Sequence, residues 1–328
     1  MTLRTFSASL ALAALATGIS APAFADTLRI GWQQIVEPSR VPQADKTYEA
    51  ATGVDVKWHL FGSGADVIAA IASGSIDIGY VGSSPLTAAA SQELPISTIY
   101  VVGNIASAEA LVVRGIEKPE DLNGKKIATP FVSTAHYSLL TALKHWGIPA
   151  SSVSLLNLRP QEIAAAWERG DIDGAYIWDP VLNQARTTGG TVLADSADVA
   201  EWGGPTFDAW IVRKDYAKEH PDIVTAFVKV TGEATDSYLA DPDAWGADSG
   251  QAKKIAELTG APAADVPALL KGYDFAGLKD QASERFLGGA TAAAIASTAT
   301  FLQEQGSAKA LNDYSPYVDG SFAEAAAK

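Results

Sequence analysis

Two acidic residues hold matching places in a repeated pattern. Glu109 begins the run Glu-Ala-Leu-Val-Val-Arg, and Asp208 begins the run Asp-Ala-Trp-Ile-Val-Arg 99 residues later. Both acids have apolar neighbours, and a carboxylate in such surroundings needs a charged or hydrogen-bonding partner. The partner is either the ammonium group of a bound solute or the arginine that ends each run, Arg114 or Arg213. An ammonium would make the site discriminate strongly against solutes that lack an amine.

Serine and threonine residues at two predicted helix starts could bind an oxyanion. After a strand that ends near Val81, Ser84 is predicted as the N-cap and Pro85 as the first helical residue. Free N–H groups at a helix N-terminus, together with hydroxyls, suit the oxygens of a sulfonate without any lysine. The alternative role of each residue is ordinary helix capping. The candidate contacts at the two helix starts are Ser83, Ser84, Thr134 and His136, and the ring of Tyr137 at the second start could close another face of the site.

A third turn and two tryptophans extend this set. Ser63 and Gly64 lie in a Gly-Ser-Gly turn before another predicted helix, whose N-terminus could face the same cleft. Trp178 follows an apolar strand, and Trp210 lies within the second acidic run. Their rings could stack over a short alkyl chain and its ammonium. Core packing is the alternative for both, and Trp178 is the stronger candidate for the cleft.

The sequence contains few of the residue patterns that are typical of enzymes. The four histidines have no metal-ligand spacing, the Walker and Rossmann glycine patterns are absent, and the chain has no cysteine to act as a nucleophile. We therefore predict a binding protein with no catalytic residue, no metal and no cofactor.

The elements that would position these residues alternate between strand and helix, which predicts a mostly parallel α/β fold. Residues 221–305 are helical in pattern and form an α-rich C-terminal layer. The sequence Gly-x-Ile-Asp at residues 74–77 recurs at residues 170–173, an offset of 96. With the acidic repeat, this predicts two similar lobes in which the two acidic strands form the hinge of a clamshell. The alternative is that such a turn is simply common in α/β proteins.

Residues 1–25 have the pattern of a secretory signal peptide. A short positive start with Arg4 precedes an apolar stretch and the small-residue pattern Ala23-Phe-Ala25, so cleavage is predicted after Ala25. The apolar stretch is too short to span a bilayer, and the absence of cysteine excludes a lipid anchor there. The remaining chain has a formal net charge of −15, which argues against nucleic acid and anionic lipid as partners. We predict a soluble periplasmic protein without direct membrane insertion.

Several longer stretches resemble a known family. They are residues 82–86, 131–147, 167–178, 202–214 and 312–315. On these stretches the chain is similar, over essentially its whole mature length, to the sulfonate, nitrate and thiamine-precursor solute-binding proteins of bacterial ABC importers. The resemblance implies a type II periplasmic-binding-protein clamshell. Lobe 1 would comprise residues 26–112 and 213–328, and lobe 2 residues 113–212.

The resemblance also implies a function: a monomer that captures taurine between its lobes and delivers it to a membrane permease driven by a cytoplasmic ATPase. Other alkanesulfonates, nitrate or a pyrimidine-type thiamine precursor are alternative solutes. An enzyme of the same fold that makes a pyrimidine is a more remote alternative, which the signal peptide disfavours, and a sensor domain is another. The implied anion contacts are Ser63, Gly64, Ser83, Ser84, Thr134 and His136, the implied amine contacts are Glu109 and Asp208, and Gln34 and Glu37 would line the crevice from the first strand-to-helix loop. Asp179 replaces a smaller residue of the family, which leaves the solute preference open.

Overall fold

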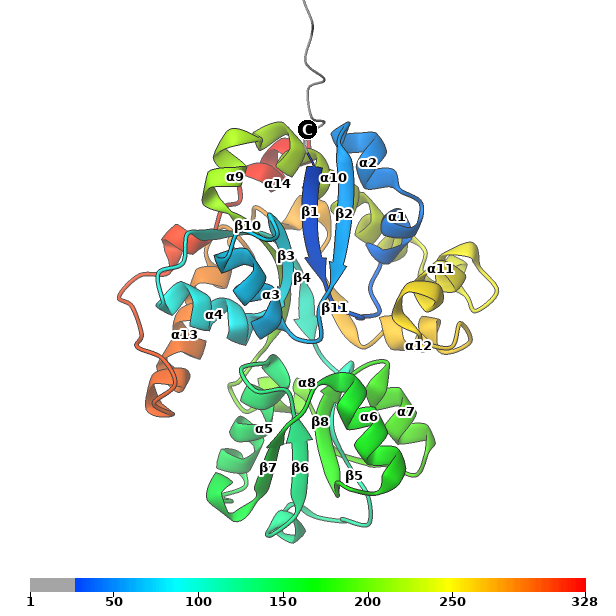
Figure 1. Cartoon of the computed structure of the whole chain (residues 1–328), viewed down its shortest axis with the longest axis vertical. Coiled ribbons are helices and arrows are strands. Elements are labelled where there is room, and N and C mark those ends of the chain that lie inside the picture. The colour runs from blue at the N-terminus through cyan, green and yellow to red at the C-terminus, as the bar shows by residue number, and fades with distance from the viewer. Residues whose placement is uncertain (1–26) are drawn as a thin grey trace, which may run out of the picture.

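The computed structural model describes residues 27–328, which form two α/β units, one above the other in Figure 1. The predicted signal peptide and its cleavage site lie outside these residues. The upper sheet has the strand order β11-β4-β10-β3-β1-β2, and the lower sheet has the order β7-β6-β8-β5-β9. The upper strands are β1 (Thr27–Trp32), β2 (Asp55–Leu60), β3 (Ile78–Gly82), β4 (Ile96–Ile105), β10 (Phe207–Arg213) and β11 (Tyr273–Phe275). The lower strands are β5 (Glu109–Val113), β6 (Lys126–Thr129), β7 (Ser154–Asn157), β8 (Gly174–Trp178) and β9 (Thr191–Asp195).

The two sheets share one topology. In each, the first strand pairs in parallel with the second and the third, and a strand from elsewhere in the sequence pairs antiparallel between the third and the fourth. That inserted strand is β10 in the upper sheet and β5 in the lower sheet. The α/β class with two similar lobes is therefore confirmed.

The inserted strands place the lobe boundaries differently from the prediction. All of β5 pairs within the lower sheet and all of β10 within the upper sheet. Hence lobe 1 comprises residues 27–105 and 207–328, and lobe 2 comprises residues 109–201. The predicted boundaries after residues 112 and 212 cut through these strands, because the chain crosses between lobes just before each acidic strand rather than along it. The two crossing segments meet where Ile105 N donates to Thr206 O at 2.9 Å.

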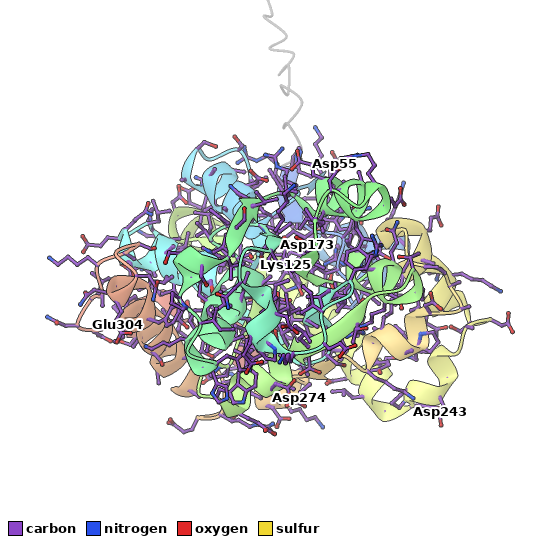
Figure 2. All side chains as sticks on the ribbon, turned by 90° about the horizontal axis from the view of Figure 1, so that it is seen from below. Asp55, Lys125, Asp173, Asp243, Asp274 and Glu304 are labelled. Atoms are coloured by element: carbon purple, nitrogen blue, oxygen red, sulfur yellow. The ribbon has the colours of Figure 1, made fainter. Side chains whose placement is uncertain are left out.

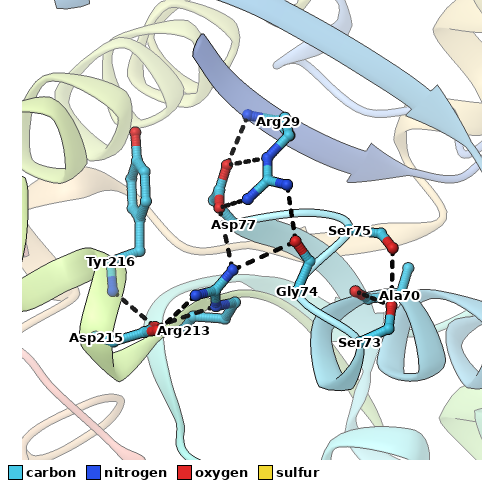
Figure 3. Close-up of polar contacts among 9 residues, drawn as sticks. All are labelled: Arg29, Ala70, Ser73, Gly74, Ser75, Asp77, Arg213, Asp215 and Tyr216. Carbon is cyan, nitrogen blue, oxygen red and sulfur yellow. Dashed lines mark hydrogen bonds and ion pairs between the residues drawn. The ribbon is translucent and has the colours of Figure 1, made fainter. Parts of the chain in front are cut away.

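The repeated Gly-x-Ile-Asp turn makes the same bonds in both lobes. Asp77 accepts the backbone N–H of Arg29 on β1 and ion-pairs with the side chains of Arg29 and Arg213, as Figure 3 shows. In lobe 2, Asp173 likewise accepts the backbone N–H of Lys126 on β6 at 2.8 Å. The carbonyl of each aspartate accepts the N–H of the arginine that ends the inserted strand. The repeat therefore fixes three neighbouring strands at one end of each sheet.

Helices cover both faces of each sheet. In lobe 1 they are α1 (Arg40–Ala44), α2 (Thr47–Thr52), α3 (Gly64–Ala72), α4 (Ser83–Ser91), α9 (Lys214–Glu219), α10 (Pro221–Ala240), α11 (Gly250–Thr259), α12 (Val266–Leu270), α13 (Ala290–Glu304) and α14 (Ser321–Ala326). In lobe 2 they are α5 (Thr134–His145), α6 (Pro160–Arg169), α7 (Val181–Thr187) and α8 (Ser196–Glu201). Large apolar side chains such as those of Trp167 and Tyr176 in lobe 2 and of Trp210 and Phe227 in lobe 1 fill the cores between these layers.

The C-terminal layer extends to two opposite sides of the molecule and contacts lobe 2 on one of them. Seen from below in Figure 2, α13 ends on one side near Glu304, and the segment with Asp243 lies on the opposite side. Glu304 forms an ion pair of 3.0 Å with Lys144 on α5. The layer is helical as predicted except for the short strand β11. Within residues 27–328, no helix is both long and apolar enough to cross a membrane.

Candidate ligand-binding site

A pocket lies between the lobes beside the two crossing segments. Lobe 1 contributes Gln33, Ile35, Gly64, Gly82, Pro85, Ile105, Asp208 and Tyr273, and lobe 2 contributes Glu109, Ser133, Thr134 and Trp178. Strands β3 and β8 end at this pocket, as expected for ligand sites in open α/β sheets, whereas the antiparallel strands β5 and β10 begin there. Among the described residues, no lysine, arginine or histidine lines it.

Three helices begin at the pocket. The first turns of α3, α4 and α5 reach it through Gly64, Pro85 and Thr134 respectively. At each start the N-cap residue is extended, and a serine side chain caps α3 and α5 but not α4. Ser63 caps α3 by accepting the N–H of Asp66, and Ser133 caps α5 by accepting the N–H of His136. Their positive ends together favour an anionic group in the pocket.

Glu109 is the carboxylate contributed by lobe 2. It is the first residue of β5 and is 1% exposed. Thr134 donates to Oε2 at 2.6 Å, Ser196 donates to Oε1 at 2.9 Å, and Ser138 adds a longer bond of 3.5 Å. Burial raises the pKa of Glu109 to about 7, although these hydroxyls oppose the shift. A cation bound in the pocket would therefore favour the ionised form of Glu109.

Asp208 is the carboxylate contributed by lobe 1. Tyr80 and Tyr273 both donate to its Oδ2, at 3.0 and 2.9 Å. No group in residues 27–328 donates to Oδ1, which lies beside Gly82 at the pocket wall. Burial raises the pKa of Asp208 to about 7, against the two tyrosine hydroxyls.

The arginine alternative for the two acids is wrong. Arg114 stacks on Trp167 and donates to its carbonyl, and Arg213 ion-pairs with Asp77 and Asp215 (Figure 3). Arg114 directly follows β5 and Arg213 ends β10, so both lie at the opposite end of their strands from Glu109 and Asp208. Within residues 27–328, neither carboxylate therefore pairs with a cationic side chain, and the two border the same pocket from opposite lobes.

Side chains close the cleft around the pocket. Arg159 of lobe 2 pairs with Asp66 of lobe 1 at 3.2 Å, and Gln161 donates to Gln34 at 2.8 Å. Farther along the rim, Asn183 donates to Asp265 at 2.8 Å. The structure therefore shows the clamshell closed.

Among the predicted contacts, Gly64, Glu109, Thr134, Trp178 and Asp208 line the pocket. Three predicted serines lie in the capping turns beside it. Ser63 makes the cap already described, the Ser83 hydroxyl accepts the N–H of Phe207, and the buried Ser84 hydroxyl has no partner among residues 27–328. The N-cap of α4 is Gly82 rather than Ser84, so this helix begins earlier than predicted.

The remaining predicted contacts lie away from the pocket. Gln34 bonds to Gln161 at the cleft rim, because its neighbour Gln33 is the one that points inward. Glu37 is buried in an ion pair with Arg40. His136 stacks on Phe131, and burial lowers its pKa. Tyr137 contacts Phe301 on α13, and Trp210 is fully buried against Tyr80 and Phe227, since its side of β10 faces the core.

Tyr273 was not predicted. It comes from β11, a three-residue strand at the edge of the lobe 1 sheet, in a segment whose pattern is otherwise helical. The alternation in Tyr-Asp-Phe was the only available signal. Within residues 27–328, no group of three or more potential metal ligands occurs.

The chain resembles proteins of known families. Residues 26–257 match the family described as the substrate binding domain of ABC-type glycine betaine transport system. The taurine-binding periplasmic protein of Escherichia coli is 48% identical over 315 residues, which cover 95% of this chain and 97% of that protein. A putative aliphatic sulfonates-binding protein of Bacillus subtilis is 31% identical over 63% of this chain and 64% of that protein.

A solved structure has the same architecture. It is the alkanesulfonate-binding protein SsuA from Xanthomonas axonopodis pv. citri bound to MOPS, with a TM-score of 0.72 and 25% identity over 86% of this chain and 94% of that chain. The predicted periplasmic-binding-protein fold is confirmed, and so is a binding component of a transporter rather than an enzyme. The chain belongs to the family of substrate-binding domains of ABC-type transport systems.

Proposed function

We propose that this protein binds taurine, or a closely similar aminosulfonate, in the pocket between its lobes. The observation that carries the proposal is that the pocket combines two kinds of group. Three helix N-termini border it, and so do two buried carboxylates that pair with no cation within residues 27–328. A short zwitterion with an anionic head and an ammonium tail matches both kinds of group. The 48% identity to a taurine-binding protein supports the same solute.

The proposed roles follow from the contacts. The N–H groups of α3, α4 and α5, with the hydroxyl of Ser84, would hold the sulfonate. Asp208, through its free Oδ1, and Glu109 would hold the ammonium. Binding would ionise both acids, because an ammonium at hydrogen-bond distance offsets the cost of burying their charge. The ring of Trp178 would cover the alkyl chain.

The assembly around the protein is part of the proposal. The protein would act as a periplasmic monomer after cleavage behind Ala25, and its closed form would deliver the solute to a membrane permease with a cytoplasmic ATPase. The mass of the secreted protein tests the cleavage site, and light scattering tests the monomer.

Calorimetry with two ligands tests the solute. 1-Propanesulfonate carries a methyl group where taurine carries its ammonium. We expect Asp208→Asn to weaken taurine binding at least about thirtyfold, because it removes one charge of a buried pair, and to change 1-propanesulfonate binding far less. Asp274→Asn is the control, since Asp274 is exposed on the same lobe.

Equal losses for both ligands would refute the amine role. Tighter binding of 1-propanesulfonate, nitrate or a pyrimidine by the wild-type protein would reassign the solute.

A further inference from the structure

A buried ion pair lies behind the wall of the pocket that Asp208 forms. Glu37 and Arg40 are 1% and 0% exposed, and the Arg40 Nη2 contacts the Glu37 Oε1. The Glu37 carboxylate also accepts the N–H and the hydroxyl of Ser39. Arg40 donates in addition to Gln43. The pair is thus held entirely by the protein, on the loop and first helix that follow β1.

Three aromatic rings enclose the guanidinium of Arg40. Its central carbon lies 5.0 Å from the ring of Trp32, 5.6 Å from that of Tyr80 and 5.7 Å from that of Trp210. The Arg40 Nε has no hydrogen-bond partner in residues 27–328. Replacing a buried ion pair by apolar residues is often neutral or stabilising, so stability alone does not explain this one.

Tyr80 links the ion pair to the pocket. Its ring packs on Arg40, and its hydroxyl donates to Asp208 at 3.0 Å. Gln33, which lines the pocket, donates to the Tyr80 carbonyl at 3.1 Å. A single aromatic ring therefore separates Arg40 from the carboxylate that would receive the ligand amine.

Several charged or titratable groups act on Asp208. Tyr80 on β3 and Tyr273 on β11 donate to it and lower its pKa, and Glu109 on β5 borders the pocket from lobe 2. The negative charge of Glu37 raises the pKa of Asp208. Arg40 opposes Glu37 at the ring of Tyr80.

We propose that Glu37 and Arg40 are positioning residues for Asp208: together they fix the ring of Tyr80 and balance the charge behind the carboxylate that faces the ligand amine. This inference rests on the proposed aminosulfonate site for its functional consequence. The effect of Glu37 and Arg40 on the titration of Asp208 concerns the ligand-free protein and does not depend on that site.

The charge balance is tested by the titration of Asp208 itself, followed by carbon NMR of the side-chain carboxyl and assigned with Asp208→Asn. Glu37→Gln leaves Arg40 uncompensated, so we expect the pKa of Asp208 to fall by about one unit, the lower end of what a nearby charge produces. Adding Arg40→Met should reverse most of that fall. If the shift came from structural damage, the second substitution would increase it instead of reversing it.

The positioning role is tested by selectivity. The double variant Glu37→Gln/Arg40→Met should stay folded yet lose at least about threefold of the preference for taurine over 1-propanesulfonate, because the Tyr80 ring is no longer held. Arg29→Met is the matched control: it breaks the ion pair with Asp77 at the other end of β3 (Figure 3) and should leave the titration and the selectivity unchanged.

The proposal is overturned if Glu37→Gln leaves the pKa of Asp208 in place, if the second substitution deepens the shift, or if the double variant keeps wild-type selectivity. Should Glu37→Gln fail to fold, the double variant still decides the positioning role. If the wild-type protein binds no taurine, the proposed function fails, and the titration still decides whether the pair acts on Asp208.

Discussion

Glu109 and Asp208 combine two opposing influences at the level of single side chains. Burial favours the protonated form of each, and the surrounding hydroxyls favour the ionised form. Burial prevails, so each pKa lies near 7. Without a ligand, the protein therefore stabilises the neutral acids, and a bound ammonium would reverse that preference. Hydroxyl groups suit this change because they can donate to a carboxylate and accept from a carboxylic acid.

The stability of the ligand-free protein should depend on pH through these acids. The pKa of Glu109 is raised from an ordinary 4.5 to about 7. Its contribution to stability is full below pH 4.5 and is lost as the pH rises through 7, by roughly 3 kcal/mol. We expect the melting temperature to fall between pH 5 and pH 8, and Glu109→Gln to remove part of that slope. Asp274→Asn should keep the slope, and a melting temperature that rises over this range would contradict the assignment.

At this level the sequence predicted residue types better than side-chain directions. The two acids were found because an acid among apolar residues is conspicuous, and both reach the pocket. The choice between Gln33 and Gln34 depends on which way an extended segment faces, and the sequence of two adjacent glutamines does not reveal it. Glu37 was assigned to the crevice because the family resemblance places the first strand-to-helix loop there, and its burial against Arg40 depends on tertiary packing that the sequence does not show.

Helices α4 and α5 meet across the cleft at Gly82. A Cβ atom on Gly82 would lie 2.6 Å from the Cγ2 of Thr134, which belongs to the other lobe. The φ angle of Gly82 is −78°, so its backbone tolerates other residues, and the close approach of α5, with Asp208 Oδ1 at 3.3 Å from such a Cβ, is what requires glycine. The two helix N-termini come this close only because that side chain is missing.

Gly82→Ala should therefore impair closure more than folding. We expect taurine affinity to fall about tenfold, since overpacking of this kind costs about 1–3 kcal/mol, while the melting temperature without ligand changes little. Gly250→Ala provides the control, because no atom lies within 4 Å of a Cβ placed there. Unchanged affinity, or a large loss of stability without ligand, would show that the contact does not govern closure.

The elements themselves were largely predictable, because the repeat at residues 74–77 and 170–173 marks equivalent turns in the two lobes. The lobe boundaries were not, since the sequence of an inserted strand does not tell which sheet it joins. That pairing is decided by long-range contacts. The edge strand β11 was missed for a similar reason, because three residues cannot establish a period.

At the scale of the whole molecule, several of the contacts that join the two lobes are made by solvent-exposed side chains. The side chains of Arg159 and Asp66 are 62% and 33% exposed, and those of Lys144 and Glu304 are more than half exposed. Exposed ion pairs of this kind are worth about 0–1 kcal/mol. A ligand that contacts both lobes is then the main source of closure energy, and its removal should shift the population toward an open form.

Small-angle scattering tests this shift. We expect the radius of gyration to be larger without ligand and to decrease when taurine is added. Gly82→Ala should remain expanded at the same taurine concentration. Identical scattering curves with and without taurine would mean that closure does not depend on the solute.

The insertion of β10 between β3 and β4 also bears on the order in which the chain can fold. All five strands of lobe 2 lie within residues 109–195, so that sheet is complete once those residues are available. The sheet of lobe 1 lacks its central strand until residues 207–213 have followed. In a chain synthesised from its N-terminus, the sheet of lobe 2 can therefore form before the sheet of lobe 1 is complete. Until β10 is available, β3 and β4 each have an unpaired edge that can associate with other chains.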